Sequence, residues 1–338
     1  MTLRSCLTAG LLAALAATSH AEEIAVGNYG VSANGMPFGV ALVKGYFKDE
    51  GLNITGLISS AGGGTSLRNM LAGGGVPYGE VNPGVVVSAI LAGADLRIVS
   101  DNVLTVAEFV WAVKPNSPIK TIKDLKGKKI GYTNPRSTSQ ALAAMLLQIA
   151  GYKPEDAELV KTGGFGEGIA ALDSAQVDIV PITEPLWSKY KDKYRAVIVA
   201  SDALPPLDNV VGVTTVEMAE KRGDFIRAVI RARRKAVVFM REHPDEAAEI
   251  VAKQYNIEPA VARSAVRNLT TSMTKGVPYW GEGEIHLEGL KRMIEAQRSV
   301  GAITGEVDYS KIIDTRLDRK STRLNSSHHT TTRMPSSA

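Results

Sequence analysis

A glycine-rich segment contains the first residues of this chain that could bind a ligand. Residues 59–75 read SSAGGGTSLRNMLAGGG, in which three glycines precede a stretch with apolar residues at helical spacing. A hydroxyl residue, Thr65 or Ser66, is typical of a helix N-cap, and a glycine loop that opens a helix attracts anions. The lysine of a P-loop and the third glycine of a dinucleotide-binding loop are both missing. We therefore predict that Gly63, Gly64 and Thr65 hold a small polar or anionic ligand, with a plain turn as the alternative.

Two further polar loops stand between an expected strand and an expected helix. The first reads NPRSTS and ends on three hydroxyl residues, namely Ser137, Thr138 and Ser139. Its Arg136 is suited to a carboxylate or sulfonate, although a solvated loop cation is an equal alternative. The second loop, GGFG, contributes Gly164. Polar loops at the carboxyl ends of strands are where open α/β sheets bind ligands.

Residues that follow other expected strands complete the predicted lining. Glu184 could accept a hydrogen bond from a ligand amine or amide, and capping of the next helix is its alternative role. Trp187 stands nearby, where a place in the core is the commoner outcome. The first and third strands are followed by polar residues at three positions: Tyr29, Asn34 and Asn82.

Catalysis and cofactor binding have little support in the sequence. Outside the two ends, the only histidines are His243 and His286, and no catalytic triad, nucleophile elbow or metal-ligand cluster is found. The basic stretch at residues 227–241 carries an apolar helical stripe, which favours an amphipathic helix over a nucleic-acid site. We expect no enzyme activity, no cofactor, no metal and no nucleic-acid partner.

The elements that must position these residues follow an α/β pattern. From Glu23 onward, short apolar strands alternate with helices, one of which is expected over residues 37–50. Two such units are joined by extended segments near residues 110–116 and 203–212, and a helical end follows. We predict a first lobe of residues 22–112 and 208–318 and a second lobe of residues 113–207. Two doubly wound sheets joined by two crossover segments would form a hinged protein with a ligand cleft.

The N-terminus has the features of a secretory signal peptide, which we assign to residues 1–21. Arg4 precedes an apolar run at residues 7–17, and a small-x-small cleavage site follows it. The run is short for a membrane span. Cys6, the only cysteine, precedes that run and is wrongly placed for a lipid anchor. We expect a soluble periplasmic protein without disulfides.

The C-terminal residues 319–338 show no apolar periodicity and are rich in Ser, Thr, Arg and His. We interpret them as a disordered, non-native tail. The net charge of the full chain is +4. Without Arg4 and the four cationic residues of the tail, the chain has one more acidic than basic residue. The charge therefore gives no support for nucleic-acid binding.

Several stretches, taken in order, resemble one family. GYFKDEGLNI, AGGGTS, AILAGADLRIV, SPIKTIKDLKGKKIGYT and AALDSAQVDIVPITEP are similar to substrate-binding proteins of ABC importers, of the nitrate, sulfonate and taurine branch. That branch includes binders of the thiamine pyrimidine precursor. The resemblance covers about residues 24–310 and implies a two-lobed type II periplasmic binding fold, a monomer, and transient partners in an ABC permease and its ATPase.

The resemblance also implies which residues contact the ligand. Carried over position by position, they are Asn28, Tyr29, Gly63, Gly64, Thr65, Asn82, Ser137, Thr138, Ser139 and Glu184. Arg136 departs from the glycine that many relatives have there, which favours an anionic ligand. The expected function is capture of a small organic anion, alkanesulfonate-like, taurine-like or an aromatic carboxylate. The alternatives are a binder of the thiamine pyrimidine precursor and a biosynthetic enzyme of the same fold.

Overall fold

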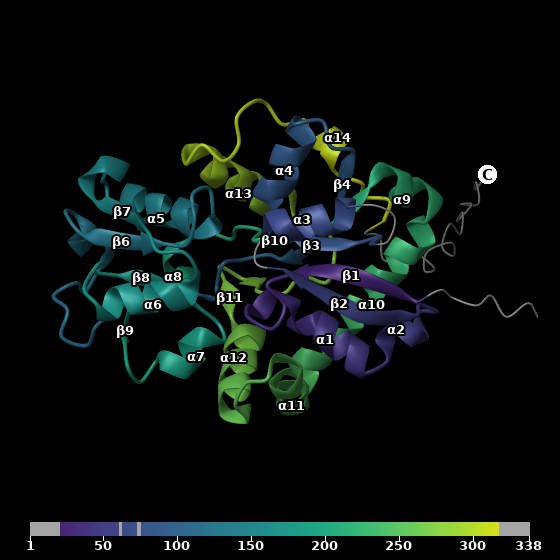
Figure 1. Cartoon of the computed structure of the whole chain (residues 1–338), viewed down its shortest axis with the longest axis horizontal. Helices are drawn as coiled ribbons and strands as arrows, with labels where there is room; N and C mark the ends of the chain where they lie inside the picture. The colour runs from purple at the N-terminus through teal and green to yellow at the C-terminus, as the bar shows by residue number, and fades with distance from the viewer. Residues whose placement is uncertain (1–20, 61–62, 73–75, 318–338) are drawn as a thin grey trace, which may run out of the picture.

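The computed structural model describes residues 21–60, 63–72 and 76–317, which form two α/β lobes lying side by side (Figure 1). The predicted signal peptide and tail fall almost wholly outside the described residues. None of the described helices combines the length and the apolar character that a membrane span requires.

The first lobe is built on a five-stranded mixed sheet. Its strands, in spatial order, are β2 (Ile54–Ser60), β1 (Glu22–Gly27), β3 (Gly79–Val81), β10 (Val210–Thr215) and β4 (Leu96–Val103). Strand β1 pairs in parallel with β2 and β3, whereas β10 runs antiparallel to β3 and β4. The central strands are buried on both faces, as expected for a sheet between two helical layers.

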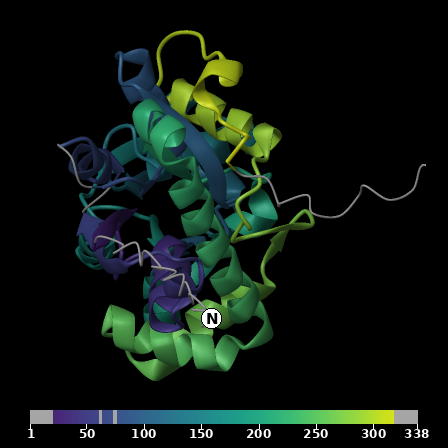
Figure 2. The ribbon, with the colours of Figure 1, turned by 90° about the vertical axis from the view of Figure 1, so that its right-hand side faces the viewer.

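Helices cover both faces of this sheet. The N-terminal part contributes η1 (Ala33–Gly35), α1 (Met36–Val43), α2 (Tyr46–Asp49), α3 (Gly63–Leu71) and α4 (Pro83–Leu91). The C-terminal part contributes α9 (Val216–Lys221), α10 (Gly223–Glu242), α11 (Pro244–Tyr255), α12 (Pro259–Thr271), the short strands β11 (Met273–Thr274) and β12 (Val277–Pro278), α13 (Leu287–Ser299) and α14 (Tyr309–Ile312). Helices α11 and α12 lie at one end of the lobe, and α13 and α14 lie at the other (Figure 2). One apolar core joins α1, α10, α11 and α12, and a second joins α3, α4 and α13.

The second lobe repeats the architecture on a smaller scale. Strands β8 (Val180–Thr183), β5 (Phe109–Val113) and β9 (Arg195–Val199) form one sheet, and β6 (Lys129–Tyr132) pairs with β7 (Glu158–Lys161). A parallel bridge between Ile130 and Ile179 joins the two pieces. The helices are η2 (Ile122–Leu125), α5 (Thr138–Ile149), η3 (Pro154–Asp156), α6 (Phe165–Asp173), α7 (Leu186–Tyr190) and α8 (Ala200–Ala203).

The chain crosses between the lobes twice, at residues 104–108 and 204–209. The first crossing precedes the predicted boundary at residue 112, because β5 pairs with β8 and β9 in the second lobe. The prediction read the apolar run at residues 106–113 as the end of the first lobe. The second crossing lies within the expected segment.

The helix expected over residues 37–50 is instead two helices, which is a correction to the sequence analysis. Gly45 separates α1 from α2 with a φ of 76°, in the left-handed region. A side chain there would be strained, whereas glycine adopts this conformation freely. The break lets Phe47 of α2 enter the core of the first lobe.

Candidate functional site

Two helix N-termini, one from each lobe, meet between the crossings. Asn82 is the N-cap of α4 and accepts a hydrogen bond from the Gly84 amide at 2.8 Å. Its side-chain nitrogen donates to the Thr138 hydroxyl, at the first turn of α5, over 2.7 Å. Thr138 in turn donates to the Asn209 side chain at 3.2 Å. Residues from lobe I, lobe II and the second crossing therefore form one hydrogen-bonded group.

Glu108 extends this group into the first crossing. Its Oε1 accepts a hydrogen bond from the Asn209 side-chain nitrogen at 2.5 Å, and its backbone carbonyl accepts from the Glu184 amide at 3.1 Å. The side chain is 1% exposed, and its Oε2 has no hydrogen-bond partner. Burial raises the pKa of Glu108 to about 8, and the polar groups around the carboxyl oppose this rise, its own backbone amide most, followed by the Asn209 amide and the Tyr279 hydroxyl.

The hydroxyl loop of the second lobe is ordered by its own side chains. Ser137 is the N-cap of α5 and accepts from the Gln140 amide at 3.2 Å, while the Ser139 hydroxyl contacts those of Ser137 and Thr133 at 2.9 Å each. Arg136 has a φ of 65° and an exposed side chain. The predicted hydroxyls thus gather at one helix N-terminus, and the exposed Arg136 directly precedes the N-cap Ser137.

The glycine segment of the first lobe leads directly into α3, which begins at Gly63. Ala61 and Gly62 lie outside the described residues, as do residues 73–75. The Thr65 hydroxyl accepts a hydrogen bond from Arg68 at 2.8 Å. The buried Ser66 hydroxyl contacts that of Ser60 at 2.5 Å, which ties α3 to the end of β2.

The loop after β1 makes several hydrogen bonds with other parts of the first lobe. Asn28 is half-buried, has a φ of 54°, and donates its amide hydrogen to the Ser60 carbonyl. Tyr29 packs edge-on against the Tyr255 ring and donates its hydroxyl hydrogen to Gln254 on α11 at 2.9 Å, and burial raises its pKa to about 12. Contact of Tyr29 with a ligand therefore requires rearrangement of this contact.

The side chain of Asn34 has one polar atom without a hydrogen-bond partner. Its side-chain nitrogen donates to the Gly27 carbonyl at 3.3 Å, but its buried Oδ1 has no partner. The residue is 6% exposed. A buried acceptor of this kind is uncommon in folded proteins.

Glu184 has the capping role that the sequence analysis gave as the alternative. Its Oε2 accepts from the Ser188 amide in α7 at 3.1 Å, and its Oε1 accepts from Asn268 of α12 at 2.7 Å. Both oxygens are occupied, so the residue joins the two lobes. Trp187 packs against the apolar cluster around β8, and Gly164 is the N-cap of α6.

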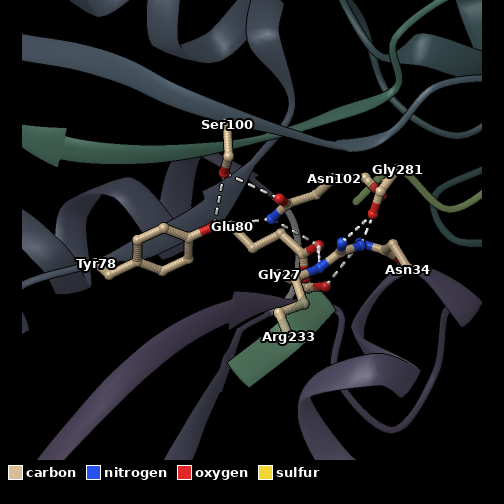
Figure 3. A network of polar contacts seen from close by, with 8 residues as sticks. All are labelled: Gly27, Asn34, Tyr78, Glu80, Ser100, Asn102, Arg233 and Gly281. Atoms are coloured by element: carbon tan, nitrogen blue, oxygen red, sulfur yellow. Dashed lines mark hydrogen bonds and ion pairs between the residues drawn. The ribbon is translucent and has the colours of Figure 1, made fainter. Parts of the chain in front are cut away.

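A second buried carboxylate, Glu80, belongs to a polar network in the first lobe (Figure 3). Arg233 of α10 lies 3.8 Å from Glu80 and donates to the carbonyls of Gly281 and Asn102 at 2.7 and 2.6 Å. The Asn102 side chain donates to Glu80 at 3.2 Å. Burial raises the pKa of Glu80 to about 7, whereas the Arg233 charge lowers it.

Five buried polar residues were not predicted from the sequence, namely Glu80, Glu108, Asn209, Arg233 and Tyr279. Two of these residues can be recognised in the sequence as charged residues inside apolar stretches. Glu80 and Glu108 each interrupt an apolar stretch, in VPYGEVN and VAEFVW. A carboxylate in a buried strand or its extension requires a partner, and that requirement could have selected both residues. Among the described residues, no group of three or more metal-binding side chains was found.

Comparison with known proteins assigns the family. Residues 32–247 match the family model described as NMT1/THI5 like, and the chain belongs to that family. A putative aliphatic sulfonates-binding protein of Bacillus subtilis (strain 168) is 24% identical over 304 residues, which cover 88% of each chain.

Solved structures share the two-lobed fold. The periplasmic aliphatic sulphonate binding protein SsuA from Escherichia coli has a TM-score of 0.75 and 20% identity, covering 94% of this chain and 97% of that one. The periplasmic nitrate-binding protein NrtA from Synechocystis PCC 6803 has a TM-score of 0.70 and 12% identity, covering 89% and 87%. The predicted periplasmic-binding-protein fold and the predicted family are both confirmed.

Proposed function

We propose that this protein is the periplasmic solute-binding component of an ABC importer, and that it captures a small organic anion between its lobes. The observation that carries the proposal is the meeting of the α4 and α5 N-termini through Asn82 and Thr138. Helix N-termini attract anions, because their amides and dipoles both point toward the bound group. The names of the relatives, which are binding proteins for aliphatic sulfonates and nitrate, support the same class of ligand.

The mechanism follows from the two crossings. A ligand docks on one lobe, the lobes rotate about residues 104–108 and 204–209, and hydroxyl and amide donors replace its hydration shell. The closed form then engages a membrane permease and its ATPase. Binding and release do not require a catalytic side chain, which agrees with relatives that are named as binding proteins.

A thermal-shift screen tests the anion proposal. Alkanesulfonates, nitrate, aromatic carboxylates and neutral pyrimidines are added to the protein, and its unfolding midpoint is followed as a function of ligand concentration. We expect a saturable rise with at least one anion, because ligand that binds only the native state stabilises it. A rise with pyrimidines alone would favour the thiamine-precursor alternative, and no rise with any compound would contradict the small-ligand proposal.

Arg136 provides a test of how the anion is held. Because Arg136 is exposed and directly precedes the N-cap of α5, Arg136→Ala should weaken binding of the best anion by about 3- to 10-fold while leaving the unfolding midpoint of the free protein unchanged. Arg263→Ala, an exposed arginine on α12, is the matched control. Calorimetric titration measures both, and equal affinities for the two variants would remove Arg136 from the site.

A further inference from the structure

Helix α13 contacts both helices whose N-termini form the proposed anion site. It packs against α4 of the first lobe and against α5 of the second lobe, and its ribbon lies between theirs (Figure 1). Its buried side chains divide between the two lobes. Leu290 and Ile294 belong to the apolar core of the first lobe, whereas Met293 belongs to that of the second lobe. A single helix is therefore embedded in the cores of both lobes.

One face of α13 also contacts the second crossing and the first turn of α4. Near the start of the helix, the Gly289 carbonyl accepts a hydrogen bond from the Asp208 amide at 3.3 Å. Further along, the buried Gln297 side chain packs against Gly84, which has no side chain to hold it off. Gly289, Met293 and Gln297 are spaced four residues apart, so they lie along the same face of the helix. This face therefore joins the second crossing, the core of the second lobe and the N-terminus of α4.

The contacts between the lobes differ in chemistry from one side to the other. At α13 and α5 the contact is apolar, and the Met293 side chain is fully buried. At α7 and α12 two hydrogen bonds join the lobes, in which Glu184 accepts from Asn268 and Lys191 donates to Ser264. Polar groups that separate bond to water instead at small cost, whereas withdrawal of Met293 from the second lobe exposes apolar surface. Movement of the lobes therefore costs least when α13 and α5 stay together.

We propose that α13 sets the spacing of the α4 and α5 N-termini, and that Met293 is a positioning residue for the anion site although it is not among the residues proposed to bind the ligand. The spacing follows from the packing of α13, and its effect on binding rests on the proposed function. Donors on two helices hold one small anion only when both helices lie at the productive separation. Truncation of Met293 leaves a cavity between α13 and the second lobe, into which α5 can shift.

Distances between the lobes test this spacing without any ligand. Spin labels are attached to cysteines at two exposed positions, Ala170 on α6 and Glu249 on α11, in the protein without its signal peptide. We expect Met293→Ala to broaden the distribution of label distances, because the cavity loosens the contact between α13 and the second lobe. Met240→Ala is the matched control, since Met240 is also fully buried but lies in the core of the first lobe. It should lower the unfolding midpoint as well, while leaving the distances unchanged.

Calorimetric titration with ethanesulfonate and with nitrate then tests the effect on binding. Met293→Ala should weaken binding of these anions by about 3- to 10-fold, because a smaller fraction of the molecules has both helix N-termini in place. Met240→Ala should bind them as the wild-type protein does. Met293→Leu keeps the volume of the side chain and should restore the affinity. If Met293→Ala does not fold, Met293→Val and Met240→Val provide the same comparison.

The two proposals fail in different ways. An unchanged distance distribution in Met293→Ala, or equal broadening in Met240→Ala, overturns the role of α13 in spacing the helices. A broadened distribution with unchanged anion affinity overturns Met293 as a positioning residue for the site. Absence of binding of ethanesulfonate and nitrate to the wild-type protein counts against the proposed function, and the label distances then decide the role of α13 alone.

Discussion

At the scale of single residues, the buried charges decide how the first lobe tolerates substitution. Arg233 is 2% exposed, forms an ion pair with Glu80 and donates hydrogen bonds to two backbone carbonyls. Removing one partner of a buried ion pair leaves the other desolvated without compensation, which costs far more than the pair itself contributes. The stability of the first lobe therefore depends on these few buried polar side chains.

Arg233→Met should lower the free energy of unfolding by about 3–5 kcal/mol, because Glu80 and the carbonyls of Asn102 and Gly281 lose their donor. The double variant Glu80→Leu/Arg233→Met should recover part of that loss, since it leaves no buried charge unpaired. Urea denaturation of the wild-type protein, the single variant and the double variant measures these free energies of unfolding. The exposed Arg263→Met serves as control and should stay within about 0.5 kcal/mol of wild type. A loss of under 1 kcal/mol for Arg233→Met would contradict this account.

Asp208 gives a prediction for pH. Its fully buried carboxyl lies against Asp101 and beside Gly289, which has no side chain to cover it. Burial and then the Asp101 charge raise the pKa of Asp208 far above its ordinary 3.8. Above pH 3.8 the folded state therefore binds more protons than the unfolded state. The free energy of unfolding falls as the pH rises from about 3.8 to the raised pKa of Asp208.

Asp208→Asn should accordingly raise the free energy of unfolding by about 1–3 kcal/mol at pH 8 and change it little near pH 4. Thermal unfolding across this pH range measures the effect. The exposed Asp192→Asn provides the comparison and should run parallel to wild type. A destabilised Asp208→Asn protein at pH 8 would show that the carboxylate is needed in its charged form.

At the scale of elements, the local sequence pattern predicted the strands and most of the helices. It could not predict contacts between residues that are far apart in the sequence. The polar loops before α3, α5 and α6 were found because glycine and hydroxyl residues mark helix starts within a few positions. Glu108 and Asn209 are 101 residues apart and meet only when both crossings lie side by side. The hydrogen bond between Glu184 and Asn268 could not be predicted from local pattern either, because the two residues belong to different lobes.

The break at Gly45 was missed because a glycine inside a helical pattern is ambiguous: it costs only about 1 kcal/mol relative to alanine. Gly45→Ala should destabilise the protein by about 1–2 kcal/mol, because φ is 76° there. Gly166→Ala is the matched control in α6, where an added Cβ has no atom within 4 Å, and should be neutral or stabilising. Denaturant unfolding compares the two variants. Equal effects would contradict the prediction that a side chain at position 45 strains the backbone.

At the scale of the whole molecule, the proposed function requires the two lobes to close on a ligand. Besides the Asn82–Thr138 and Glu184–Asn268 hydrogen bonds, the lobes touch where Lys191 donates to Ser264 at 3.2 Å, between the end of α7 and α12 (Figure 1). Neither Lys191 nor Ser264 is among the residues proposed to bind the ligand. Their contact therefore offers a way to hold the lobes together without altering the site.

The most direct test is ligand titration of a protein whose lobes are joined at this contact. In Lys191→Cys/Ser264→Cys, made without the signal peptide and its Cys6, a short cleavable crosslinker is added to the two thiols. We predict that the protein binds its anion before crosslinking, fails to bind within the time of the titration when crosslinked, and regains binding when the linker is cleaved. Unchanged binding rate and affinity in the crosslinked protein would contradict a ligand site between the lobes.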